Sequence, residues 1–149
     1  MYKVGELTVK ELMRKRFSTV NTTDDIRDVI RVLMKTDTAS VAVFYRNKFV
    51  GEIHEVDLLK LAINPKKIPE EDVIPLGVGL DMGYFAKVAG DIARRHEISV
   101  TPETKVSEAA YTMLRQGVKT VPVMEGNKMV GIITEKDILR AITSTRVEK

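Results

Sequence analysis

The sequence contains no cysteine, no tryptophan and only two histidines among its 149 residues. The lack of cysteine excludes disulfides, thiolate metal sites and a cysteine nucleophile. His54 and His96 form no H-E-x-x-H pattern, which leaves little for a metal centre or a catalytic base. A Walker-type glycine-rich loop is also missing. We therefore expect a protein that is not an enzyme and that needs no cofactor or metal, and we expect that any nucleotide in contact with it is bound and not hydrolysed.

Aromatic residues make up only 5% of the chain, and long apolar runs are absent. Few aromatics leave no stacking platform for single-stranded nucleic acid, and a net charge of +3 does not demand such a partner. No run approaches the roughly 18 apolar residues of a membrane helix. The opening stretch, MYKVGELTVKEL, has no signal-peptide apolar core. We expect a cytoplasmic protein with no membrane association, and nucleic acid is only an alternative partner.

The chain does contain an internal repeat. A shift of 80 residues aligns Val20–Leu61 with Val100–Ala141 without a gap and gives eleven identities over 42 positions. The identities cluster at the end of each copy, where Asp57 matches Asp137. We predict a first repeat at residues 1–63, a linker at 64–87 and a second repeat at 88–149.

Each copy has the same predicted order of helix, strand, helix, strand, strand and helix, which is a mixed α/β (α+β) fold. Apolar residues at helical spacing and short β-branched runs indicate these elements. We predict N-caps at Asp24 and Thr104 and a helix end at Gly117. The expected elements are opening helices at Thr8–Arg14 and Val88–Arg94, extended segments at Phe17–Val20 and Glu97–Val100, core-facing helices at Ile26–Met34 and Val106–Leu114, strands at Ser40–Tyr45, Phe49–Ile53, Thr120–Glu125 and Met129–Ile133, closing helices at Glu55–Ile63 and Glu135–Ile142, and a turn of helix in the linker at Glu70–Val73. We expect Leu80–Phe85 to pack on the body of the protein, and a surface for a partner is the alternative.

The most informative stretch is Asn127–Ile142, NKMVGIITEKDILRAI, which predicts a buried strand, Thr134, and a helix. The first turn of a helix has free N–H groups and the positive end of the dipole, so a phosphate can bind there. A carboxylate such as Asp137 repels an anion but accepts two hydrogen bonds from a ribose diol. The alternative is an ordinary capping box of Thr134 and Asp137.

Matched basic triplets, Arg14–Arg16 and Arg94–His96, follow the opening helices. Most of these side chains are expected to be solvated cations near a helix C-terminus. One from each triplet could instead reach a phosphate.

The duplicated pattern resembles a pair of CBS domains, known together as a Bateman module. The resemblance rests on Val121-Pro122-Val123 in one strand and on Gly131-Ile132-Ile133-Thr134-Glu135-Lys136-Asp137 at the last strand-to-helix junction. It implies two repeats packed through their sheets about a pseudo-two-fold axis, with two clefts between them that bind AMP, ADP, ATP or S-adenosylmethionine. It also implies a regulatory, energy-sensing role and pairing with a second copy as a homodimer.

By this resemblance, Asp137 holds the ribose hydroxyls and Thr134 contacts phosphate. The base is expected to lie against Ile98–Val100 and Lys119–Pro122, which adds Ile98, Val100, Lys119, Thr120 and Pro122 to the predicted site.

The first copy departs from the motif, because His54 replaces the threonine and Ala42 replaces the proline, although Asp57 is kept. His54 could donate to a phosphate or be a surface residue. Because histidine is a poor cap, we do not expect Asp57 to belong to a capping box. The second-copy site is therefore predicted to be the working one.

We expect a regulatory module that binds an adenosine ligand, AMP foremost, and signals to an effector protein in another chain. A ligand-free interaction scaffold is the main alternative, followed by binding of S-adenosylmethionine or nucleic acid.

Overall fold

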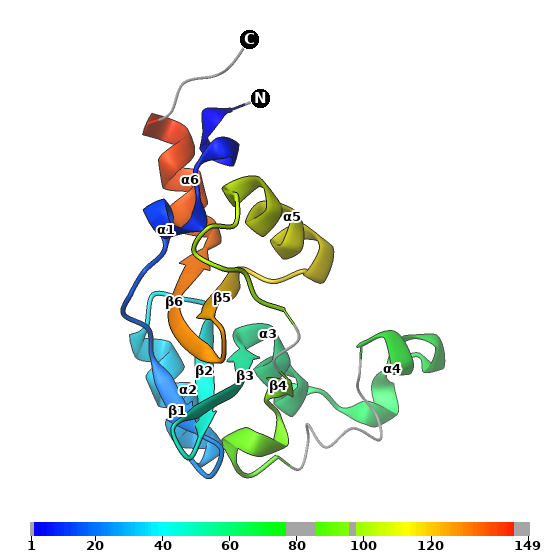
Figure 1. The fold of residues 1–149 in the computed structure, drawn as a ribbon. Helices are drawn as coiled ribbons and strands as arrows, with labels where there is room; N and C mark the ends of the chain where they lie inside the picture. Colours follow the sequence, from blue (N-terminus) through cyan, green and yellow to red (C-terminus); the bar gives the residue numbers. More distant parts are fainter. Residues whose placement is uncertain (1, 77–85, 96–97, 145–149) are drawn as a thin grey trace.

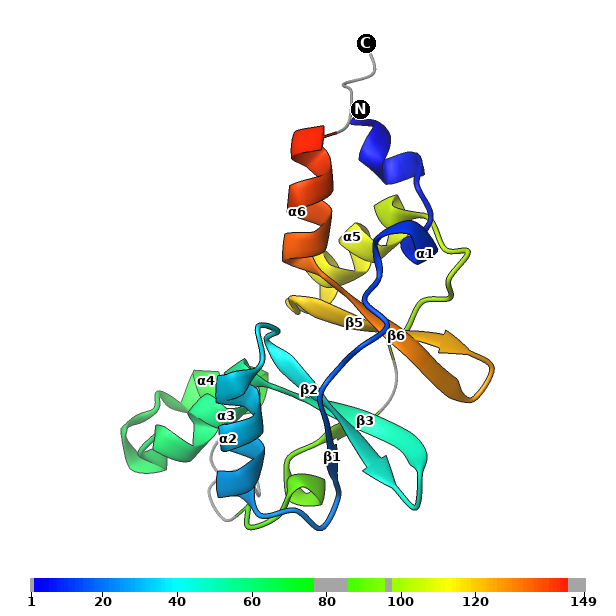
Figure 2. The ribbon, with the colours of Figure 1, turned by 90° about the vertical axis from the view of Figure 1, so that its left-hand side faces the viewer.

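The computed structural model describes residues 2–76, 86–95 and 98–144. Its two repeats form two lobes that face each other through their β-sheets, with the described ends of the chain both on the second-repeat lobe (Figures 1 and 2). The elements in chain order are the 3₁₀ turn η1 (Lys3–Glu6), α1 (Val9–Leu12), β1 (Thr19–Asn21), α2 (Ile26–Lys35), β2 (Ser40–Tyr45), β3 (Lys48–His54), α3 (Glu55–Leu58), the 3₁₀ turns η2 (Leu59–Ala62) and η3 (Pro65–Lys67), α4 (Glu70–Leu76), the 3₁₀ turn η5 (Ala89–Asp91), β4 (Arg94–Arg95), α5 (Val106–Gln116), β5 (Thr120–Glu125), β6 (Lys128–Thr134) and α6 (Glu135–Ser144).

Each lobe is built on an antiparallel hairpin, β2–β3 in the first repeat and β5–β6 in the second. The two hairpins pair in equivalent registers. Ser40 lies opposite His54 in the first hairpin, and Thr120 lies opposite Thr134 in the second. Parallel β1 extends the first hairpin, and Val100 makes the corresponding single bridge to Val123 in the second. The four hairpin strands therefore lie within one residue of the positions that alternation and β-branching predict.

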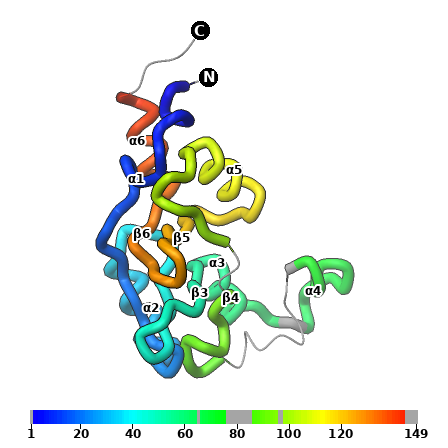
Figure 3. Tube along the Cα trace, in the orientation of Figure 1, coloured from blue at the N-terminus to red at the C-terminus, as the bar shows by residue number. Residues whose placement is uncertain are grey.

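The segment that opens each repeat crosses over and packs on the other repeat. Val4 and Val9 belong to the core of the second repeat, whereas Ala89 belongs to the core of the first. The backbone contacts are matched: the N–H of Val9 donates to Thr104 O, and the N–H of Ala89 donates to Asp24 O, both at 2.8 Å. The tube in Figure 3 shows the blue N-terminal segment running from the second-repeat lobe down to β1. The two lobes are thus interlocked by their first residues.

The sheets meet in an apolar interface between the repeats. Ala42 from the first repeat packs with Met124, Met129 and Ile132 from the second, and partly buried phenylalanines close the cluster. The hydroxyls of Ser40 and Thr120, which are equivalent under the 80-residue shift, hydrogen-bond to each other across this interface. This packing confirms the predicted association of two repeats through their sheets.

The structure corrects several predicted helix ends. Asp25, not Asp24, caps α2 by accepting the N–H of Arg27, and Lys105 precedes α5 where Thr104 was expected. Asp24 and Thr104 instead accept N–H groups three residues upstream, those of Asn21 and Thr101. In both cases a turn just before the helix takes the side chain that was expected to cap it.

Two further predictions about element type are only partly right. The opening helix of the second repeat is a 3₁₀ turn, and Arg94–Arg95 is a short strand that pairs with β3. The closing helix of the first repeat changes to a 3₁₀ turn after Leu58. The predicted end of α5 at Gly117 is confirmed, because this glycine adopts the left-handed conformation at φ 65°.

The predicted core faces of α2 and α5 are also narrower than expected. Ile26, Val29 and Leu33 are buried, but Met34 is 79% exposed and its equivalent Leu114 is 84% exposed. Helix α4 projects from the side of the first lobe (Figure 1) and extends the single turn predicted in the linker. The expectation for Leu80–Phe85 lies outside the described residues. Within the described ranges, none of the helices has the length and apolarity to cross a bilayer.

Candidate functional site

Two clefts lie between the repeats, and the 80-residue shift relates one to the other. The Thr134 cleft has a volume of about 310 Å³ and the His54 cleft about 440 Å³. The Thr134 cleft is lined by Leu33, Met34, Thr36, Asp37, Thr38, Ala39, Glu55, Lys119, Thr120, Thr134, Glu135 and Lys136. The His54 cleft is lined by Ala39, His54, Glu55, Val56, Leu59, Gly117, Val118 and Lys119.

The two clefts differ in chemistry although they are equivalent in position. The Thr134 cleft presents several threonine hydroxyls together with Lys119 and Lys136. In the His54 cleft, Val56 and Val118 stand where the other cleft has Lys136 and Thr38. The Thr134 cleft, which Asp37, Glu55 and Glu135 also line, is therefore the better suited to a hydroxyl-bearing ligand, and Lys136 gives it one lysine more than the His54 cleft.

Thr134 and Asp137 form a capping box at the start of α6. The Asp137 Oδ2 accepts the Thr134 N–H at 3.1 Å and its hydroxyl at 2.8 Å, and the Asp137 N–H donates back to Thr134 Oγ1 at 3.2 Å. The N–H of Glu135 donates to Lys119 O at 2.9 Å. The capping alternative is thus realised, and the helix tip has fewer free N–H groups than the sequence predicted.

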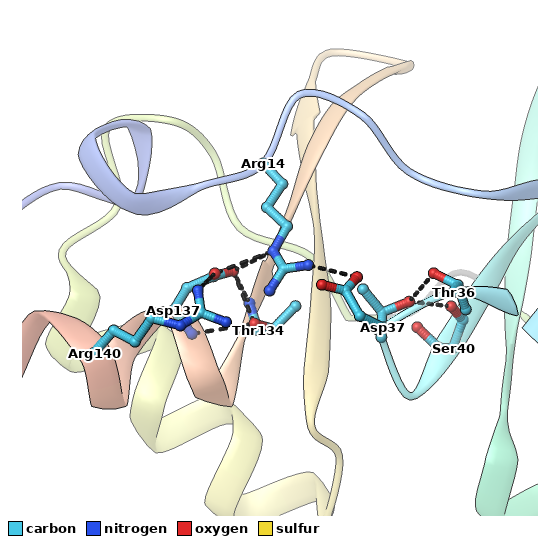
Figure 4. Close-up of polar contacts among 8 residues, drawn as sticks. Arg14, Thr36, Asp37, Ser40, Thr134, Asp137 and Arg140 are labelled. Atoms are coloured by element: carbon cyan, nitrogen blue, oxygen red, sulfur yellow. Dashed lines mark hydrogen bonds and ion pairs between the residues drawn. The ribbon is translucent and has the colours of Figure 1, made fainter. Parts of the chain in front are cut away.

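A third residue, Arg14, holds the same carboxylate (Figure 4). Its Nε lies 3.0 Å from Asp137 Oδ1 and 3.2 Å from Oδ2, and its Nη1 lies 2.7 Å from Asp37 Oδ1. Partial burial lowers the pKa of Arg14, but the hydrogen bonds to Asp37 and Asp137 outweigh it, so this pKa is raised on balance. The same hydrogen bond from Arg14 lowers the pKa of Asp37. Arg14 is therefore a permanent cation between an acid of each repeat.

The first repeat carries the equivalent ion pair. Arg94 donates from Nε to Asp57 Oδ2 and from Nη2 to Asp57 Oδ1, both at 2.8 Å. The hydrogen bond with Asp57 is the largest cause of a raised pKa at Arg94, and the charge of Glu52 adds to it. Each arginine comes from the segment that opens one repeat and binds the aspartate that closes the other. The first arginine of each basic triplet thus reaches a carboxylate.

Asp57 also accepts the N–H of His54 at 3.3 Å, so it does take part in capping α3, contrary to our expectation. His54 is 3% exposed and is not the surface residue that one alternative described. Its Nε2 lies 3.6 Å from Oε1 of buried Glu52. Among the described residues, that Nε2 and Glu52 Oε2 have no hydrogen-bond partner.

The glycine of the repeated motif is explained by the crossing segments. A Cβ on Gly131 would lie 2.4 Å from Arg14 O, and one on Gly51 would lie 1.9 Å from Arg94 O. Arg14 also exchanges backbone hydrogen bonds with Ile132 at 2.8 and 2.9 Å. The missing side chain therefore lets each crossing segment reach the strand beside it and aim its arginine at the aspartate.

The structure brings together only part of the predicted site. Thr134, Lys119 and Thr120 line the Thr134 cleft, and His54 and Lys119 line the His54 cleft. Asp137 and Asp57 are buried, and each takes part in the N-terminal cap of its helix. The remaining three positions lie off both cleft walls: Ile98 and Val100 pack in the core of the second repeat, and Pro122 lines a void of about 10 Å³ between the sheets.

Sequence reasoning missed the pairing partners of the two aspartates. The available signal was the 80-residue shift, which relates Arg14 to Arg94 just as it relates Asp57 to Asp137. Asp37 could not be found in this way, because its equivalent is Gly117. Within the described residues, no group of three or more histidine, aspartate or glutamate side chains could hold a metal ion.

Comparison with known families gives a match to the CBS domain over residues 9–64 and 89–144. Among curated proteins, the uncharacterised protein MJ1426 of Methanocaldococcus jannaschii is 28% identical over 158 residues, which cover 93% of each chain. MJ1225 of the same organism is 26% identical over 137 residues, and there the match covers 91% of this chain but 43% of the relative. Some relatives are therefore more than twice as long as this chain.

Solved structures share the fold. CBSX2 in complex with AMP superposes with a TM-score of 0.76 at 24% identity, covering 92% of this chain and 97% of CBSX2. A CBS domain-containing protein of Thermotoga maritima superposes with a TM-score of 0.74 at 22% identity, covering 96% and 99%.

Proposed function

Since the chain belongs to the CBS-domain family and carries two copies of the domain, we propose that it is a regulatory module whose Thr134 cleft binds an adenosine ligand. AMP is the first candidate, and ADP or ATP are related ones. The observation that carries the proposal is a buried carboxylate, Asp137, beside a cleft that combines threonine hydroxyls with Lys119 and Lys136. The volume of the Thr134 cleft falls at the lower end of the range for small-molecule sites.

The parts of an adenylate match the parts of this cleft. Lys119 and Lys136 offer positive charge to a phosphate beside the N-terminus of the ten-residue helix α6. Asp137 offers acceptors to the ribose diol. CBSX2, which has the same fold, was solved in complex with AMP, and this supports an adenine nucleotide as the first ligand to test.

The output of the module is the relative placement of the two repeats. A ligand held between them favours one arrangement by its difference in affinity for the two arrangements. We propose that the chain acts as a homodimer in the cytoplasm and passes this change to an effector protein in a different chain.

A ligand-free scaffold is the competing function, and one observation favours it. Asp137 is already bonded to Thr134, Arg14 and Arg140, so the carboxylate has a complete structural role without any ligand. A thermal-shift panel with AMP, ADP, ATP, S-adenosylmethionine and GTP distinguishes the two functions, because a ligand that binds only the native state raises the melting temperature. No shift with any of the five compounds would support the scaffold.

The role of Asp137 is tested with Asp137→Asn, which keeps an oxygen for the cap but loses the charge. Loss of charge-assisted hydrogen bonds worth about 1.5–3 kcal/mol predicts that AMP affinity falls roughly ten- to hundredfold in calorimetry. Asp57→Asn is the matched control, because it makes the same change at the His54 cleft and should leave this affinity unchanged. Equal AMP affinity in all three proteins would show that Asp137 is only a capping residue.

A further inference from the structure

The acceptor capacity of Asp137 is fully used inside the protein. Oδ2 accepts two hydrogen bonds from Thr134, and Oδ1 accepts Arg14 Nε at 3.0 Å and Arg140 Nη1 at 3.3 Å. A carboxylate offers about four lone-pair positions. A ribose diol that needs two of them must therefore displace two protein donors.

Arg14 and Arg140 are the two donors that the diol must displace, and Arg14 is the more firmly held of them. The bonds from Thr134 belong to the cap of α6, and the Arg140 contact is longer and comes from a side chain that is 66% exposed. Arg14 approaches from the far end of the chain, and only its Nε reaches Asp137. It also has a second acid, because Asp37 lies 2.7 Å from its Nη1 on the wall of the Thr134 cleft (Figure 4). The guanidinium can thus leave Asp137 and remain ion-paired.

The equivalent arginine is held more firmly. Arg94 uses two nitrogens for the two oxygens of Asp57, both at 2.8 Å, and such bidentate pairs are the stronger kind. Glu52 adds favourable charge near Arg94. At the position equivalent to Asp37 stands Gly117, which offers Arg94 no second carboxylate.

We propose that Arg14 and Arg94 act as intramolecular latches, each occupying an aspartate carboxylate in competition with the ribose of a ligand, and that the Arg14 latch is the easier to open. This inference rests on the proposed function, since it concerns the same clefts. It follows that the Thr134 cleft fills first and that one ligand binds per chain. The observed affinity of each cleft is the intrinsic affinity multiplied by the fraction of molecules in which its latch is open.

Opening a latch also frees the segment that carries it. Arg14 follows α1, and residues of this segment pack in the core of the second repeat. By thermodynamic reciprocity, a ligand that releases Arg14 weakens the hold of the second repeat on this segment. The N-terminal segment is thus the part of the fold that senses occupancy of the Thr134 cleft.

Calorimetry with adenosine tests the latches, because adenosine presents the ribose diol without a phosphate that could attract Arg14. In Arg14→Met the aliphatic stem remains and the competing donor is lost, so adenosine should bind roughly three- to tenfold more tightly, with one site per chain. Arg94→Met should leave the first site unchanged and add a second one. Arg16→Met, which removes an exposed cation from the same segment, is the control and should match the wild type.

Wild-type protein provides a second test that does not depend on the folding of a variant. In ¹H–¹⁵N spectra of arginine side chains, adenosine should shift the Nε–H resonance of Arg14 at concentrations that leave that of Arg94 unmoved. The two arginine variants assign these resonances.

Three results would overturn the latches. Unchanged or weaker adenosine binding in Arg14→Met, together with an unmoved Arg14 resonance at saturation, would contradict the latch and leave the proposed function standing. Two equal sites in the wild type would contradict the ranking of the two arginines. No binding of adenosine to any of the four proteins, with no shift in the nucleotide panel, would remove both the latch and the proposed function.

Discussion

At the residue scale, the repeated motif serves the protein's own structure. Thr134 and Asp137 cap α6, Gly131 admits the crossing segment, and Asp137 binds the arginine that this segment delivers. Structural contacts therefore account for the motif without a ligand, and the proposed ligand would have to compete with contacts that stabilise the unliganded fold. Arginine suits the competing role because its guanidinium stays charged and presents several donors in a planar fork.

Substitution of the motif glycine tests this structural role. In Gly131→Ala the new Cβ would meet Arg14 O at 2.4 Å, a contact that only a shift of backbone can relieve. Overpacking of this kind is expected to destabilise the fold by roughly 1–3 kcal/mol in urea unfolding.

Gly51→Ala is the matched comparison and should be the more destabilising, since its Cβ would lie 1.9 Å from Arg94 O. Wild-type stability in both variants would mean that the crossing segments do not press on β3 and β6.

At the element scale, the crossing segments decide which residues share a core. Val9 is fully buried against the second repeat although it precedes the first, and Ala89 is fully buried in the first repeat although it opens the second. Apolar spacing shows that such residues are buried, but it does not show against what. A repeat of this size has too little apolar surface to bury by itself, so exchanging segments enlarges both cores.

Val9→Ala tests the exchange. Loss of two methyl groups from a fully buried site should destabilise the protein by roughly 1–3 kcal/mol. In native-state hydrogen exchange, the loss of protection should be greatest in α5 and α6 of the second repeat, because η1 and α1 contact those helices.

Ala89→Gly is the counterpart in the first repeat and should deprotect β1 and α2 instead. Greater deprotection of α2 than of α5 in Val9→Ala would contradict the crossed arrangement.

At the scale of the whole molecule, the exposed apolar side chains repeat with the sequence. Met34 and Leu114 are equivalent positions and are 79% and 84% exposed, and Leu59 and Leu139 form a second exposed pair. Equivalent positions of the two repeats thus expose apolar side chains to solvent. Such a surface suits the proposed second copy of this chain, because a two-fold arrangement presents matching patches to each other.

The proposed homodimer predicts that these side chains are covered in solution. Met34→Lys combined with Leu114→Lys should convert a dimer into a monomer in light scattering, since buried lysines at an interface core lose hydration. Lys35→Met, which alters an adjacent position without adding charge, should leave the mass unchanged. A wild-type mass of one chain would remove the homodimer from the proposal.

The sequence by itself determined the repeats, the four hairpin strands and the motif, because apolar spacing and the 80-residue identity are present in the order of the residues and need no knowledge of tertiary contacts. It also identified Thr134 and Asp137, since a cap and its partner lie three residues apart. Only the tertiary structure decided what those aspartates bind. Arg14 and Asp137 are 123 residues apart, and they meet because the opening segments cross between repeats. That crossing is set by shared burial and by close backbone approach at two glycines, which no local pattern encodes.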